Sequence, residues 1–169
     1  YTNAQKKPYK DKFAHTFSIV ARDENTGEMG VAVQSHWFAV GYSVAWAKSG
    51  VGVVATQSFV NPSYGPNGLK LMEDGLSAEE ALNKLINLDQ GEAFRQVAFL
   101  DVDGNTAAHT GEKCIFEASH IAHENFSVQA NMMLNDQVVP EMQYAFMIHR
   151  DLPLAERLIE VLKAAQKAG

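Results

Sequence analysis

Hydroxyl and amide side chains gather where predicted strands end, and these residue types suit acyl-transfer chemistry. A hydroxyl oxygen can attack a carbonyl carbon, and a side-chain amide can donate to the oxyanion that then develops. The cluster also has a plainer explanation, because polar residues at strand ends often cap backbone groups without any substrate. The candidates are Thr16, Ser35, Thr56, Gln57, Ser58, Asn61, Tyr64, Gln129 and Asn131.

Several other catalytic motifs are missing from the sequence. There is no Gly-x-Ser-x-Gly elbow, no P-loop and no Gly-x-Gly-x-x-Gly fingerprint. Residues 101–105, DVDGN, resemble the start of a calcium loop, and Glu112 stands at the twelfth position of such a loop, but Ala107, Ala108 and His109 fill the ligand positions between them. We interpret this stretch as a hairpin turn.

The histidines leave a metal site open as an alternative. His120 and His123 are three residues apart, a spacing that converges on a helix but not on a strand. No acidic or thiol ligand stands at a diagnostic distance from them. A metal-bound water could still be held through the fold by His15, His36, His109 and His120.

The element that must position the hydroxyls is a hairpin over residues 15–35. Apolar and polar residues alternate with a period of two in both halves, and Gly27 suits the turn between them. A turn centred there pairs Thr16 with Ser35, Ser18 with Val33 and Val20 with Val31 on one face. One face of the hairpin then has an apolar base and two hydroxyls at its rim.

The remaining pattern predicts an antiparallel α+β fold. Strands are expected at 40–47, 50–57, 119–121 and 126–133, and a hairpin at 95–110. Helices are expected near 66–75, from a capping box at Ser77, and after Pro140 and Pro153. Strands that are apolar on both faces belong between layers, which places helices outside stacked sheets.

Composition narrows the class of protein. With 14 Lys and Arg against 20 Asp and Glu, the net charge of −6 offers no basic surface for nucleic acid. No apolar run is long enough to span a bilayer, so we expect a soluble chain. Residues 1–14 are polar and lysine-rich and predict an N-terminal arm, followed by a single domain over 15–169. Because Tyr1 is not methionine, we expect that an export or targeting segment was removed or that the chain was trimmed.

Seven ordered blocks resemble the Domain of Unknown Function 1028 family over residues 16–169. They are HTFSIVARD, GVAVQS, GVGVVATQSFVNPSYGPNGL, GLSAEEAL, RQVAFLD, AHTGEKCI and FSVQANMM. The resemblance implies the four-layer αββα sandwich of two stacked antiparallel sheets found in N-terminal nucleophile (Ntn) hydrolases. It also implies that relatives continue past residue 169 into a further strand, so a shortened chain or a cleaved precursor with a second chain is expected.

In Ntn hydrolases the first residue of the mature chain is the nucleophile, and its own α-amine is the base. The matching position by resemblance is Thr16, but fifteen residues precede it here, so its nitrogen is an amide. Lys48, on a predicted turn, is a candidate replacement amine.

The leading hypothesis is a hydrolase of a small amide or related acyl substrate that needs no cofactor. Thr16 or Ser35 is its expected nucleophile, and the amides of Gln57 or Asn131 are its expected oxyanion donors. The alternatives are the metal-dependent hydrolase and a non-catalytic assembly module in which Trp37 and Phe38 anchor a homo-oligomer. We assign catalysis to Thr16, Ser35, Gln57 and Ser58, and substrate binding to His36, Asn61, Tyr64, His109 and Asn131.

Overall fold

The computed structural model describes residues 15–169, so the arm predicted at 1–14 lies outside the described residues. One antiparallel sheet, sheet A, has the strand order β2-β1-β8-β7. Its pairing of Thr16 with Ser35, Ser18 with Val33 and Val20 with Val31 confirms the predicted hairpin register. The strands are β1 (Thr16–Arg22), β2 (Met29–Ser35), β7 (Ser119–His123) and β8 (Phe126–Asn131).

The second antiparallel sheet, sheet B, is built from one continuous part of the chain in the order β3-β4-β5-β6. The turn between β5 and β6 is closed by Asp101, whose Oδ1 accepts from the backbone nitrogens of Asp103 and Asn105. This geometry confirms a hairpin turn at residues 101–105. The strands are β3 (Ala45–Lys48), β4 (Gly52–Ser58), β5 (Arg95–Asp101) and β6 (Thr106–Thr110).

The strand predicted at 40–47 is wrong over its first half. A short helix, α1 (Gly41–Val44), stands there instead, and β3 begins only at Ala45. The carbonyl oxygen of Val40 accepts from the backbone nitrogens of Ser43 and Val44, and the Ser43 hydroxyl adds a third bond to it. Local side-chain and backbone bonding therefore overrides the apolar strand pattern.

Four longer helices flank the sheets, and their starts follow local chemistry. The predicted capping box is present: Ser77 Oγ accepts from the Glu80 nitrogen, and the Glu80 carboxylate accepts from the Ser77 nitrogen. Pro140 lies in the first turn of its helix, and Pro153 directly precedes the last one. The helices are α2 (Tyr64–Glu73), α3 (Ala78–Ile86), α4 (Val138–Ile148) and α5 (Leu154–Ala168), with a 3₁₀ turn, η1, at Glu92–Phe94.

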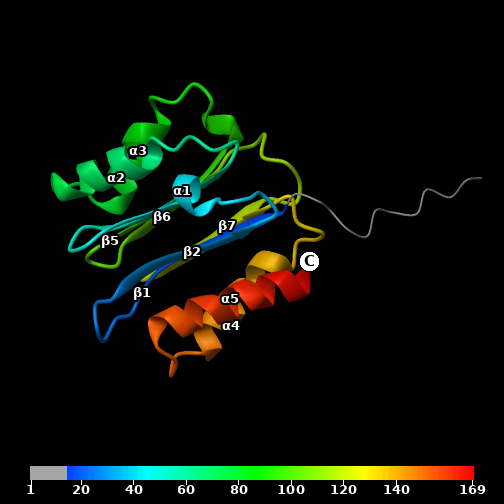
Figure 1. Ribbon diagram of the computed structural model, residues 1–169. Helices are drawn as coiled ribbons and strands as arrows, with labels where there is room; N and C mark the ends of the chain where they lie inside the picture. Colours follow the sequence, from blue (N-terminus) through cyan, green and yellow to red (C-terminus); the bar gives the residue numbers. More distant parts are fainter. Residues whose placement is uncertain (1–14) are drawn as a thin grey trace, which may run out of the picture.

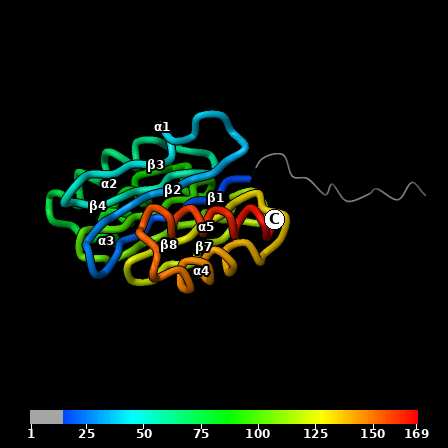
Figure 2. Tube along the Cα trace, turned by 60° about the horizontal axis from the view of Figure 1, so that its bottom comes forward, coloured from blue at the N-terminus to red at the C-terminus, as the bar shows by residue number. Residues whose placement is uncertain are grey.

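The helices pack on the outer faces of the two sheets, whose inner faces meet (Figures 1 and 2). Phe17 and Val128 of sheet A contact α4 and α5 through one apolar cluster, and Val54 and Phe99 of sheet B contact α2 and α3 through another. A third cluster, which includes Val20, fills the space between the sheets. The mixed α+β class with two antiparallel four-stranded sheets and five α-helices is therefore confirmed.

Among residues 15–169, none of the helices combines the length and apolar character needed to cross a bilayer.

Candidate active site

A cavity of about 730 Å³ opens where β1 begins and where β2 and β4 end. Thr16, Ser35, Gln57 and Ser58, the four residues assigned to catalysis, all line it. Apolar side chains form much of the remaining wall, including Trp37, Phe38, Val44, Phe59, Ile115 and Met132. The chain thus brings its predicted catalytic residues together from three strands.

Two hydroxyls touch each other in this cavity. Thr16 Oγ1 lies 2.8 Å from Ser35 Oγ, and the Trp37 nitrogen donates to Ser35 Oγ over 3.1 Å. The pairing of β1 with β2 produces the contact, because directly opposite residues point to the same face. Thr16 is only 5% exposed, so a substrate must enter the cavity to reach its hydroxyl.

The basic side chains that could activate the Thr16 hydroxyl, two histidines and Lys48, do not point into the cavity. The His15 ring stacks on Phe17, with centroids 5.9 Å apart, and Phe17 faces α4 and α5. His15 is therefore on the face of β1 opposite to Thr16, and the exposed His36 ring lies 6.4 Å from that of His15. Lys48 pairs with Glu73 at 2.6 Å and lies opposite Gly52, at the other end of sheet B from Ser58. It is too far away to serve as the replacement amine.

A buried network of side-chain amides lies behind the hydroxyls, between the two sheets. Ser18 Oγ donates to Gln57 Oε1 and accepts from Gln129 Nε2, each over 2.7 Å. Gln57 Nε2 donates to Gln96 Oε1 at 2.7 Å, and Asn131 Nδ2 donates to the same oxygen at 2.9 Å. All five side chains are at most 1% exposed.

Gln96 is the centre of this network, and the sequence pattern did not single it out. Its Nε2 donates to Thr110 Oγ1 and to the carbonyl oxygens of Ser119 and Ala130. The two bonds to carbonyl oxygens reach across from sheet B to sheet A. The sequence did carry one sign of this role. Gln96 stands next to the apolar run 97–100 of its strand, and the strand pairs it with Gln57.

The amides expected to stabilise an oxyanion are already bonded within the network. Gln57 Nε2 also donates to the Gln129 carbonyl oxygen at 3.5 Å, which uses its second hydrogen. Asn131 keeps a second Nδ2 hydrogen, and its buried Oδ1 has no partner in the described part of the chain. Asn131 pairs with Thr16 in the sheet but is fully buried behind the cavity wall, whereas Gln57 lines the cavity itself.

Asn61 and Tyr64 contact Asp89 rather than the cavity. Asn61 Nδ2 and the Tyr64 hydroxyl donate to Asp89 Oδ2 at 3.4 and 3.2 Å. Arg95 Nε donates to the same oxygen at 2.8 Å, and this bond is the main reason that the pKa of Asp89 falls to about 2. Burial is the main cause that raises the pKa of Tyr64.

Arg95 extends from this carboxylate to the cavity, where it is a lining residue that the sequence did not reveal. Its Nη1 donates to the Phe59 carbonyl oxygen over 2.7 Å. Asn61 and Tyr64 therefore act on the cavity only indirectly, by holding the carboxylate that fixes this guanidinium.

The remaining histidines do not assemble a ligand set. His109 Nε2 lies 3.0 Å from Glu92 Oε2, and His120 Nδ1 lies 2.8 Å from Thr110 Oγ1. Burial lowers the pKa of His120. Over residues 15–169, no three His, Cys, Asp or Glu side chains come close enough together to hold a metal ion.

A family model described as a family of unknown function, DUF1028, matches residues 16–169. The chain belongs to the DUF1028 family. The crystal structure of a Silicibacter pomeroyi protein assigned to DUF1028 superposes with a TM-score of 0.87 at 33% identity. That similarity covers 92% of this chain and 69% of the other. None of the curated proteins matches the chain.

In this DUF1028 chain, several non-glycine residues at the cavity have a left-handed backbone conformation. Ser58 and Met132, which line it, have φ values of 69° and 60°, and Ala39 in the adjoining loop has 57°. Left-handed backbone costs a residue with a Cβ roughly 1–2 kcal/mol. Such strain concentrates at functional sites, where the surrounding structure enforces it.

Proposed function

We propose that this DUF1028 chain hydrolyses a small amide or a related acyl compound, and that its stacked sheets form the αββα sandwich of Ntn hydrolases. Two helices on each outer face and two antiparallel sheets between them support the second part. The observation that carries the first part is the contact between Thr16 Oγ1 and Ser35 Oγ in a cavity with strained walls.

In the proposed reaction, Thr16 is the nucleophile. Its Oγ bonds to the acyl carbon, its proton passes through a base to the leaving amine, and the bond between carbon and nitrogen breaks. Water then hydrolyses the ester and restores the hydroxyl. The base is the α-amine of Thr16, which is released when the peptide bond to His15 is cleaved.

The surrounding residues suit this role. Ser35 bonds the nucleophile, Asn131 offers an unused amide hydrogen on the neighbouring strand, and Arg95 provides a positive charge at the wall. The apolar wall would accept an aliphatic or aromatic group on the substrate. We keep Gln57 and Ser58 as supporting groups, and we assign Asn61 and Tyr64 to positioning Arg95 through Asp89.

The proposal is tested with a β-lactone probe, which a nucleophilic hydroxyl opens to give a stable ester. Two forms are compared by mass spectrometry of tryptic peptides: the intact chain and a chain that begins at Thr16. We expect the label on Thr16 of the shortened chain, at least tenfold above the intact chain, and none on its Thr16→Ala variant. Ser49→Ala, on an exposed turn, is the matched control and should label normally. Equal labelling of both forms, or none, would overturn the proposal.

Homo-oligomeric assembly is a second candidate, since large apolar side chains stand exposed beside the cavity. Trp37, Phe38 and Tyr42 are 69%, 99% and 90% exposed. Aromatic residues are frequent anchors of protein interfaces. Light scattering of the chain should show a dimer or larger species, and Phe38→Ser should shift it to the monomer. A monomeric parent chain would exclude this candidate.

A further inference from the structure

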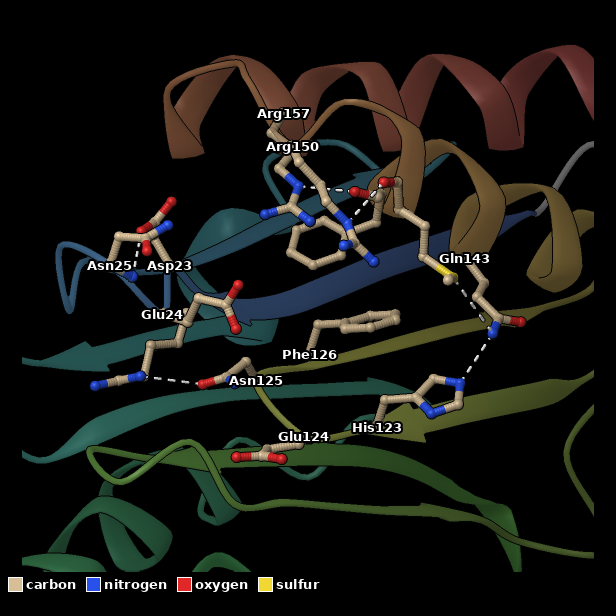
Figure 3. Close-up of a pocket in the computed structure, with 13 residues that line it drawn as sticks. Asp23, Glu24, Asn25, His123, Glu124, Asn125, Phe126, Gln143, Arg150 and Arg157 are labelled. Carbon is tan, nitrogen blue, oxygen red and sulfur yellow. Dashed lines mark hydrogen bonds between the residues drawn. The ribbon is translucent and has the colours of Figure 1, made fainter.

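A second pocket lies at the far end of sheet A, between the β1–β2 turn and helices α4 and α5 (Figure 3). Its volume is about 320 Å³. Three of its lining residues are arginines: Arg22 ends β1, Arg150 follows α4, and Arg157 lies on α5. We call it the arginine pocket. Thr16 begins the strand that Arg22 ends, so the pocket is about 20 Å from the hydroxyl pair at 3.3 Å per residue.

The three guanidinium groups are poorly satisfied by the protein. Each carries five N–H bonds. In the described chain, Arg22 Nη1 donates to Asn125 Oδ1, Arg150 Nε to the Met147 carbonyl oxygen and Arg157 Nε to the Phe146 carbonyl oxygen. Within residues 15–169 none of the three forms an ion pair within 4.0 Å, and the buried Arg22 Nε has no partner at all. Many donors thus remain for a ligand.

Two of the positive charges lie near each other, and that of Arg157 is partly buried. Arg157 lies 3.5 Å above the Phe146 ring, and Arg150 extends beside it from the same wall (Figure 3). Burial lowers the pKa of Arg157, and the charge of Arg150 contributes in the same direction. An anion between the two groups would relieve both effects.

The acidic residues of the pocket do not form ion pairs with Arg150 or Arg157. Asp23 Oδ1 accepts from the backbone nitrogens of Asn25 and Thr26, which fixes the turn. Asp23 and Glu24 attract Arg157 but stay beyond ion-pair distance, and the exposed Glu24 and Glu124 lie at the rim. The lining carries three carboxylates and three guanidinium groups, so no net positive charge attracts a ligand, and recognition of an anion rests on the N–H donors that the arginines leave unused.

We infer that the arginine pocket binds a small oxyanion, the carboxylate or phosphate group of a small molecule. Arg150 and Arg157 donate hydrogen bonds to its oxygens from the helix side, and Arg22 and Asn125 contact it from the strand side. Planar guanidinium groups match both anions through paired N–H bonds. Because the chain carries a net charge of −6, its overall field repels anions, and any saturable binding must come from a local site.

Isothermal titration of the 169-residue chain tests the site, with inorganic phosphate in one arm and acetate in the other. Ionic strength is held constant with chloride. We expect saturable one-to-one binding, and the tighter arm identifies the group that the site prefers. Arg150→Gln should weaken that binding at least tenfold, since Arg150 is exposed and its loss leaves the core intact. Arg150→Lys should weaken it less, because it keeps the charge but loses the planar fork.

Lys167→Gln is the matched control, because it removes one positive charge from an exposed position on α5 and lines no part of the pocket. It should bind as the parent chain does. Arg157→Lys keeps a charge at the second position and should also weaken binding, and circular dichroism checks that each variant is folded. Absence of saturable binding in both arms, or unchanged binding by Arg150→Gln, would overturn the inference.

Discussion

Gln57 Nε2 donates to Gln96 Oε1 over 2.7 Å, which ties the strand that ends at the cavity to the centre of the buried amide network. Gln96 continues the connection to the carbonyl oxygens of Ser119 and Ala130 in the other sheet. The space between the sheets therefore has two parts: an apolar region around Val20 and a polar region around Gln96. Because hydrogen bonds are directional, the polar part fixes how the two sheets sit on each other.

Replacing the centre of this network should destabilise the fold strongly. Gln96→Leu removes one hydrogen bond each from Gln57 Nε2, Asn131 Nδ2 and two carbonyl oxygens, and most of these bonds are buried. Each unsatisfied buried group costs about 1–3 kcal/mol, so we expect a loss of at least about 3 kcal/mol in urea unfolding. Gln166→Leu, at an exposed position on α5, should change the free energy of unfolding by less than about 0.5 kcal/mol. A loss below about 1 kcal/mol at Gln96 would contradict this role.

Asp89 should make stability depend on acid pH. Its pKa is about 2 in the folded chain, below its ordinary value of 3.8, mainly because Arg95 donates to it. A carboxylate with a lowered pKa stabilises the fold above its unfolded pKa, and that contribution is lost as pH falls from about 4 through 2. We expect about 2 kcal/mol from this group. Asp89→Asn should lose it at about pH 6 and show a correspondingly flatter curve between about pH 4 and 2, as followed by urea unfolding.

A side chain at Gly68 should destabilise the fold, although Gly68 lies inside a helix. A Cβ added there would overlap the Phe99 ring. Alanine improves helix propensity by up to about 1 kcal/mol, but overpacking a core costs about 1–3 kcal/mol. We therefore expect Gly68→Ala to lower the free energy of unfolding by about 1–2 kcal/mol. Gly41→Ala is the control, since a Cβ added at Gly41 meets no atom within 4 Å and the stability should stay within about 0.5 kcal/mol.

The capping box of α3 should contribute measurably to thermal stability. Ser77→Ala removes the acceptor for the Glu80 nitrogen and one of the two donors to the Glu80 carboxylate. Loss of such a cap costs about 1 kcal/mol, which lowers the melting temperature by about 2–4 °C in a chain of this size. Ser49→Ala, on the turn before β4, is the control and should melt within about 1 °C of the parent in differential scanning calorimetry. Equal melting temperatures for both variants would refute the cap's role.

Local patterns predicted much of the fold, because neighbouring residues decide it. Alternation set the β1–β2 register, and with it the contact between Thr16 and Ser35. The capping box at Ser77 was visible for the same reason. The helix at Gly41–Val44 was missed because bonds to the Val40 carbonyl oxygen compete with an apolar run that looks like a strand.

Contacts between distant segments decided the rest of the site. Gln96 became central only when two sheets faced each other, and Asp89 reached Asn61 and Tyr64 across the α2–α3 segment. The assignment of His36 to substrate binding stays a prediction, and its exposed ring lies beside that of His15. Successive residues at a strand end point to opposite faces, and Ser35 already faces the cavity.

The pairing of β1 with two partners has a consequence for synthesis on the ribosome. β2 follows β1 at once, whereas β8 places Asn131 beside Thr16 more than a hundred residues later. Sheet B comes from one uninterrupted stretch and can close while translation continues. Until residues 126–131 emerge, the second edge of β1 stays open, and an open edge invites pairing with other chains. Among residues 15–169, the strand that is made first is thus one of the last to gain both of its partners.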